Sequence, residues 1–118
     1  MFLDNLYKIK NFDVTPETIL AAISLDPDHT LFEGHFPNSP VLPGVVQLQI
    51  VKELLEKHLG RNVKMKSMRT SKFIQVINPK ETPDVYIDIK FKNAEFLEVV
   101  ASGSCEGVTF FKAQVSYI

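Results

Sequence analysis

The sequence predicts a single α+β domain over residues 1–118, in which one amphipathic helix packs against an antiparallel sheet of five or six strands. Three observations support this prediction. A chain of 118 residues has the usual size of one compact domain. Apolar residues alternate at period two in several segments and change to helical spacing in only one. Short connections between successive strand segments favour an antiparallel meander.

Period-two alternation predicts strands on both sides of the helix. Before it, Thr18 to Leu25 forms the clearest segment, and Leu6 to Lys10 is a shorter candidate. Asn93 and the pair Glu106-Gly107 stand where hairpin turns are expected. After the helix, the same alternation recurs in residues 63–76, 85–91, 96–104 and 111–117.

The spacing predicts a helix from Val45 to Leu59, because leucines and valines recur there at intervals of three and four residues. Pro43 lies near its start and Gly60 at its end, as helix boundaries prefer. The apolar side covers more than half of the circumference, so the helix has to be enclosed by a curling sheet. The expected polar stripe consists of Gln49, Lys52, Glu53 and Glu56.

Composition and charge exclude several classes of function. Thirteen Lys plus Arg against fourteen Asp plus Glu give a net charge of -1, which disfavours nucleic-acid binding. The single cysteine, Cys105, forms no internal disulfide and suits a reducing compartment. There is no secretory signal pattern and no apolar stretch near the ~20 residues that span a bilayer. We therefore expect a cytoplasmic protein without membrane insertion.

The connection from Asp26 to Gly44 carries the functional information. These nineteen residues show no periodicity and hold four of the seven prolines. Loops of this length in a small domain are usually functional or disordered. Disorder fits badly here, because apolar residues such as Leu31, Phe32 and Leu42 are unfavourable in water and the prolines lower the entropy of the free chain. The segment is therefore expected to be an ordered loop that delivers groups to a site.

Residues 34–37 read Gly-His-Phe-Pro and residues 43–45 read Pro-Gly-Val, and this pattern resembles the β-hydroxyacyl-acyl-carrier-protein dehydratases of fatty acid synthesis. The match is dense over residues 32–49, and Ser-Lys-Phe at 71–73 is similar to the family's strand after the helix. The family's N-terminal His-Arg-x-Pro stretch is absent. The resemblance implies a hot-dog fold, with a long helix wrapped by a bent antiparallel sheet and two subunits joining their edge strands, or assembling further.

The resemblance implies that His35 is the catalytic base, which moves the α-proton of the acyl thioester. Imidazole suits this role because its unperturbed pKa of about 6.5 allows it to take and return a proton near neutrality. Gly44, at the predicted helix start, would help form the pocket for the thioester oxyanion. No cofactor is implied. His29, Glu33 and His35 have a spacing that a metal site can use, but the dehydratase pattern explains His35 better, and we expect no metal.

The sequence departs from the family at Gln49, where the family has Glu or Asp contributed across the dimer interface. Glutamine donates and accepts hydrogen bonds but does not supply a proton. Three interpretations stay open: Gln49 orients substrate or water while His35 makes both proton transfers, a nearby acid such as Glu53 or Glu33 substitutes, or the protein binds acyl chains without dehydrating them.

Further residues are assigned to binding. Four basic side chains after the helix are candidates for steering an acidic acyl carrier protein, although a solvated sheet face also explains them. They are Lys64, Lys66, Arg69 and Lys72. The residues expected to bind the acyl chain are Phe32, Phe36, Pro43, Val45 and Phe73.

The sequence thus predicts a homodimeric enzyme that reversibly dehydrates a 3-hydroxyacyl chain on acyl carrier protein to the trans-2-enoyl form. One alternative is a hot-dog thioesterase, in which Gln49 or Glu53 directs water at the carbonyl. Another is a non-catalytic acyl-binding subunit, whose partner supplies the missing acid.

Overall fold

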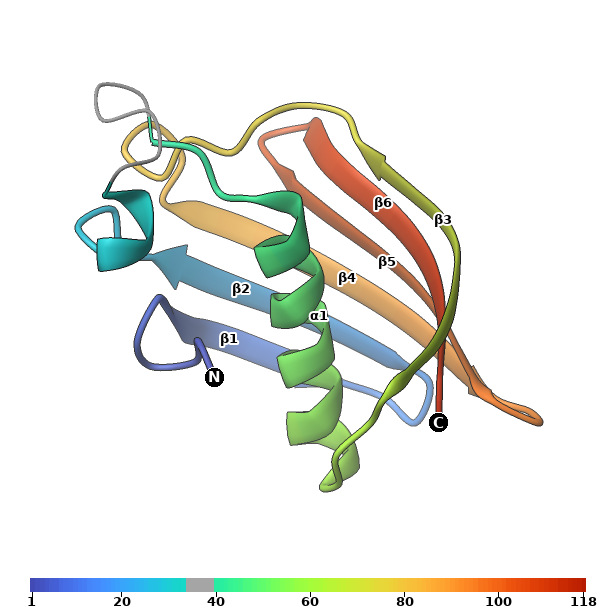
Figure 1. Cartoon of the computed structure of the whole chain (residues 1–118). Coiled ribbons are helices and arrows are strands. Elements are labelled where there is room, and N and C mark those ends of the chain that lie inside the picture. Colours follow the sequence, from blue (N-terminus) through green and yellow to red (C-terminus); the bar gives the residue numbers. More distant parts are fainter. Residues whose placement is uncertain (34–39) are drawn as a thin grey trace.

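The computed structural model describes residues 1–33 and 40–118. The chain forms six strands, one long α-helix and a single 3₁₀ turn (Figure 1). In chain order, the elements are β1 (Tyr7–Val14), β2 (Thr18–Leu25), η1 (Thr30–Phe32), α1 (Gly44–Leu59), β3 (Met65–Phe73), β4 (Asp84–Asn93), β5 (Leu97–Cys105) and β6 (Val108–Tyr117).

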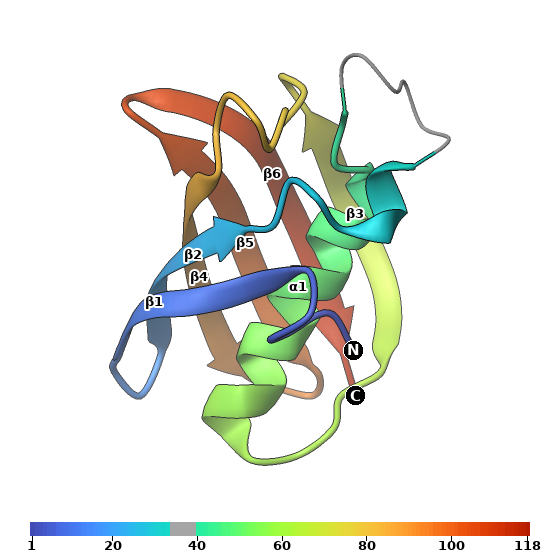
Figure 2. The same cartoon turned by 90° about the vertical axis from the view of Figure 1, so that its left-hand side faces the viewer.

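The six strands form one antiparallel sheet in the order β1-β2-β4-β5-β6-β3. The sheet bends around one side of α1, so that the helix lies in its concave face (Figures 1 and 2). The tight β5–β6 turn is made by Glu106 and Gly107, both at positive φ (49° and 80°), as predicted. The α+β class and the wrapped helix are as expected from the sequence.

The bounds of α1 follow from local chemistry. Pro43 has φ −61° and ψ 148° and stands at the N-cap, where its missing N–H costs nothing. Gly60 ends the helix in the left-handed region at φ 69°, and its N–H bonds to the Glu56 carbonyl. The apolar side is buried against the sheet, including Ile50 and Leu54 at 1% and 0% exposed. At 16 residues α1 is too short to cross a membrane, and no other helix in the described ranges is long and apolar enough.

The predicted meander is wrong at β3. Strands β4, β5 and β6 follow one another, but β3 pairs with β6 at the far edge of the sheet. The connection over residues 74–83 carries the chain across, anchored by the buried Ile77, whose carbonyl accepts the N–H of Leu42 at 2.9 Å. All nine residues of β3 are exposed, so the alternation in this segment does not bury one face. Its register also shifts at Lys66 and Arg69, as β-bulges do at sheet edges.

The predicted polar stripe of the helix is also wrong in one place. Glu53 is only 1% exposed, and Gln47, which was not assigned to the stripe, is 4% exposed. A helical wheel places both residues near apolar positions. Burying a polar side chain requires hydrogen-bond partners inside the fold. The hydrophobicity pattern of the helix does not show whether Glu53 and Gln47 have such partners.

Candidate active site at the amino end of the helix

The N-terminus of α1 opens onto a cavity of about 450 Å³. Four residues assigned to the site from the sequence line it together: Pro43, Gly44, Val45 and Phe73. The first three come from the start of the helix, and Phe73 comes from the end of β3. The fold therefore brings together two segments that are separate in the sequence.

The helix start carries hydrogen-bond donors that the chain does not use. The N–H groups of Val46 and Gln47 both reach the Pro43 carbonyl at 3.1 Å, and Pro43 offers no side-chain cap. Within the described ranges, the N–H groups of Gly44 and Val45 have no acceptor. Unpaired N–H groups and the positive end of the helix dipole favour negative charge. This place therefore suits an oxygen that gains negative charge.

The walls of the cavity are apolar and open to solvent. Val45 is 77% exposed, Phe73 49% and Val76 68%, and Ile74 lies between the latter two in sequence. A cluster of exposed apolar side chains is typical of a binding surface. Ile74 and Val76 were missed as lining residues because their alternation indicated only a strand.

Gln47 also lines the cavity and was missed. Its Nε2 donates to the Leu42 carbonyl at 2.9 Å, whereas its buried Oε1 has no partner in the described part of the chain. A small void of about 10 Å³, bounded by Gln47, Leu42 and Phe111 among others, lies between the helix and the sheet. A volume of this size holds about one water molecule.

Two predicted residues fall outside the described part of the chain. His35 and Phe36 belong to residues 34–39, so their predicted roles as base and chain-binding residue stay predictions. The neighbouring Phe32 is 6% exposed and lines a separate hollow of about 240 Å³ with His29 and Glu33. Phe32 is thus placed in the core beside the loop and not in the cavity at the helix start.

Gln49 does not line the cavity either. It lies on α1 with its Nε2 donating to Glu53 Oε2 at 3.0 Å. Glu53, considered from the sequence as a substitute acid, is buried and accepts hydrogen bonds from the chain itself. Glu33 is exposed at the end of η1. Within one subunit, therefore, the described residues place no accessible carboxyl beside Gln49.

His29 has a structural place. Its Nδ1 accepts the N–H of Leu31 at 2.9 Å as the N-cap of η1, and its Nε2 lies 3.0 Å from Asn5 Oδ1. An accepting Nδ1 assigns the proton to Nε2, which then donates to Asn5. The ring fixes the loop to the N-terminal segment.

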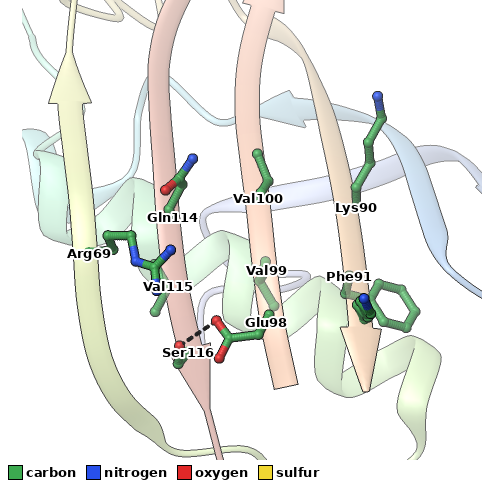
Figure 3. A pocket seen from close by; sticks show the side chains of 10 residues that line it. Arg69, Lys90, Phe91, Glu98, Val99, Val100, Gln114, Val115 and Ser116 are labelled. Carbon is green, nitrogen blue, oxygen red and sulfur yellow. Dashed lines mark hydrogen bonds between the residues drawn. The ribbon is translucent and has the colours of Figure 1, made fainter. Parts of the chain in front are cut away.

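A second groove, of about 420 Å³, lies on the face of the sheet opposite to α1 (Figure 3). Arg69 from β3 and Lys90 and Lys92 from β4 bring positive charge to it. Its acidic member, Glu98, accepts a hydrogen bond from the Ser116 hydroxyl at 2.7 Å. The other predicted docking residues are exposed along β3 and before it: Lys64, Lys66 and Lys72.

The family model that matches this sequence is described as ApeI-like, ApeI dehydratase, and it covers residues 11–108. The chain belongs to the ApeI-like dehydratase family. The match includes β2, the whole loop to Gly44, α1 and strands β3 to β5. The family resemblance read from residues 32–49 is confirmed.

Curated relatives and solved structures agree with this family. A 3-hydroxyacyl-[acyl-carrier-protein] dehydratase FabZ of Erythrobacter litoralis is 27% identical over 116 residues, which cover 91% of this chain and 76% of that protein. The dehydratase heterocomplex ApeI:P from Xenorhabdus doucetiae superposes with a TM-score of 0.77 at 20% identity, covering 93% of this chain and 96% of that one. A mutant thioesterase from Pseudomonas aeruginosa gives 0.67 at 14% identity, covering 97% and 81%. The fold is a hot-dog fold.

Gly44→Ala is expected to lower the catalytic activity of this ApeI-family protein about tenfold or more, while changing the melting temperature little. A Cβ at this position would lie 2.7 Å from Phe73 Cζ, but that ring is half exposed and moves at low cost. The displaced ring and the added methyl would narrow the space beside the helix N–H groups. A tenfold loss of rate corresponds to a rise of about 1.4 kcal/mol in the activation free energy. Turnover assays and thermal melts measure the two effects. Unchanged activity would contradict the role of this cavity.

Gln49→Glu is expected to make stability depend on pH. The introduced carboxyl would lie about 3 Å from the Glu53 side chain, and the repulsion between two carboxylates at this distance would raise the pKa of the introduced group above its unfolded value of about 4.3. A raised folded-state pKa gives stability that is complete below the unfolded pKa and is lost as pH rises through the folded one. The variant should therefore lose about 1–2 kcal/mol more than the native protein between pH 4 and pH 8. Urea melts at several pH values give the unfolding free energy of each protein. The same pH dependence in the variant and the native protein would refute this prediction.

Proposed function

We propose that this protein catalyses the reversible dehydration of a 3-hydroxyacyl chain carried by acyl carrier protein to the trans-2-enoyl form. The observation that carries the proposal is the apolar cavity at the helix start, where the N–H groups of Gly44 and Val45 lack acceptors within the described ranges. Membership of a dehydratase family, and FabZ relatives at low identity, support it.

The cavity suits each stage of this reaction. The acyl chain would pack along Val45, Phe73 and the neighbouring apolar residues, with the thioester carbonyl against the N–H of Gly44. His35 would remove the α-proton while the carbonyl oxygen gains the negative charge that the helix N-terminus stabilises. The bond from Cβ to the hydroxyl oxygen then breaks, and the imidazolium returns its proton so that the hydroxyl leaves as water.

We propose that the complete site needs two subunits. Gln49 does not line the cavity that contains Gly44, so the two groups do not meet within one chain. Strand β3 is one of the two edges of the sheet, and it carries the exposed apolar side chains of Met65, Met68 and Phe73. Pairing of β3 with a second copy would cover these side chains and continue the sheet. In the dimer, His35 of one subunit would work with Gln49 of the other.

We propose the groove that contains Arg69 as the docking surface for the acidic carrier protein. Arg69, Lys90 and Lys92 supply its positive charge, and Glu98 is engaged with Ser116. Charge complementarity of this kind mainly raises the association rate. Charge reversal at Arg69 and Lys90 should raise the KM for the carried substrate and leave kcat unchanged. An unchanged KM would remove this surface from the proposal.

A second candidate is a subunit that needs a different partner for catalysis. The bond between Gln49 and Glu53 favours it, because neither side chain offers an accessible acid. A solved neighbour is itself described as a dehydratase heterocomplex, ApeI:P. In this case the partner would supply the acid that Gln49 does not.

The deciding experiment is hydration of a trans-2-enoyl thioester on acyl carrier protein, followed by loss of its conjugated absorbance. Turnover by the purified protein alone would support the proposed function. Release of free thiol would indicate a thioesterase instead. Absence of turnover alone, with activity restored by a copurifying partner, would favour the second candidate.

A further inference from the structure

Glu53 is an acidic side chain inside the protein, 1% exposed, and the described part of the chain pairs it with no cation. Its Oε1 accepts the N–H of Leu3 at 2.9 Å and the hydroxyl of Tyr7 at 3.1 Å. The N–H of Phe2 reaches both oxygens, at 3.1 and 3.0 Å. The amide of Gln49 donates to Oε2 at 3.0 Å. Every contact is a donor, which is the arrangement that stabilises a carboxylate.

The phenol of Tyr7 acts as the donor in its hydrogen bond with Glu53. Burial, and after it the negative charge of Glu53 and the hydrogen bond between them, raise the pKa of Tyr7 above its ordinary value. The phenol therefore remains protonated and donates at any pH at which the protein works. Glu53 Oε1 therefore acts as the acceptor in its contact with Tyr7.

This carboxylate determines how Gln49 is oriented. A glutamine amide has one donor end and one acceptor end, and the bond to Glu53 uses the donor end. Rotating the amide by 180° would bring Oε1 against a carboxylate oxygen, which repels it. Gln49 is half-buried, and its Oε1 has no hydrogen-bond partner in the described ranges. The carbonyl oxygen is thus the end of Gln49 that is left for a ligand.

We propose that Glu53 is a positioning residue that holds Gln49 with its carbonyl oxygen toward the site, so that Gln49 accepts the hydrogen bond of the substrate's β-hydroxyl. The inference rests on the proposed function and deepens it. A hydroxyl that donates to Gln49 keeps its oxygen lone pairs free for the proton from His35. The departure from an acid at position 49 then has a chemical meaning: His35 carries both proton transfers, and Gln49 orients the leaving group.

A double-mutant cycle tests the coupling. Glu53→Gln should lower kcat for hydration about tenfold with KM within about twofold, and it should have no further effect in a Gln49→Ala background. Glu56→Gln is the matched control, since Glu56 also accepts a backbone N–H, from Val63 at 3.0 Å, but near the other end of the helix. That control should leave kcat unchanged. An equal loss from Glu53→Gln in both backgrounds would show a purely structural role and overturn the proposal.

Side-chain amide signals of Gln49 in nitrogen-15 NMR give a readout that needs no turnover. Gln49→Ala identifies them by their loss. In the native protein these protons should exchange slowly with solvent, and Glu53→Gln, but not Glu56→Gln, should shift them and speed the exchange. Fast exchange in the native protein would overturn the proposal even if Glu53→Gln does not fold. An inactive native protein with slow exchange would instead count against the proposed function and leave the orientation of Gln49 established.

Discussion

Replacing His35 with alanine is expected to lower kcat for enoyl hydration by about 10³-fold, within the range of 10² to 10⁴ that general acid–base catalysis contributes. The described residues offer no substitute. Glu53 is buried and saturated with donors, and Gln49 does not titrate. The variant should also lose the limb of the pH–rate profile that this imidazole contributes. Both effects are measured in the same absorbance assay.

His58 provides the matched control for that substitution. It lies in the last turn of α1, at the end opposite the cavity, with its ring 5.5 Å from the ring of Phe91. His58→Ala should keep the native kcat, although it removes an aromatic contact. If His35→Ala kept more than about a tenth of the native activity, the proton transfers would have to be reassigned.

Local chemistry made much of the fold predictable. The helix ends were predictable because proline restricts φ at Pro43 and glycine permits the positive φ of Gly60. Both preferences act without tertiary contacts. The turn at Glu106 and Gly107 was readable for the same reason. Gly44, Val45 and Phe73, which the sequence assigned to a site, line one cavity, and their roles there stay predictions.

Features that depend on distant contacts were not predictable from local patterns. The place of β3 beside β6 is set by a connection whose anchor, Ile77, resembles any other apolar residue in the sequence. The burial of Glu53 depends on donors from Phe2, Leu3 and Tyr7, about fifty residues earlier. A helical wheel of α1 alone predicts that the Glu53 carboxylate is exposed to solvent. It is buried because the N-terminal segment supplies its hydrogen-bond donors.

Gly103→Ala is expected to cost about 3 kcal/mol of unfolding free energy, at the upper end of the usual penalty for overpacking a core. Gly103 faces Phe111 across the β5–β6 pair, and a Cβ there would lie 2.3 Å from Phe111 Cε1. Phe111 is 1% exposed, so its ring has no free space to enter, unlike the half-exposed Phe73 beside Gly44. Urea melts should show the loss, and the melting temperature should fall by roughly 10 °C.

Making room at Phe111 should reverse part of that cost. In a Phe111→Leu background, Gly103→Ala is expected to cost at least about 1 kcal/mol less, because the branched side chain leaves the edge of the ring's volume empty. Ser102→Ala, one residue earlier on the same strand and pointing to the opposite face, should change stability by less than about 0.5 kcal/mol. An equal cost of Gly103→Ala in both backgrounds would show that backbone pairing, and not the ring, requires the glycine. Phe111 also bounds the small void beside Gln47. The same ring therefore excludes a Cβ at Gly103 and packs beneath the start of the helix.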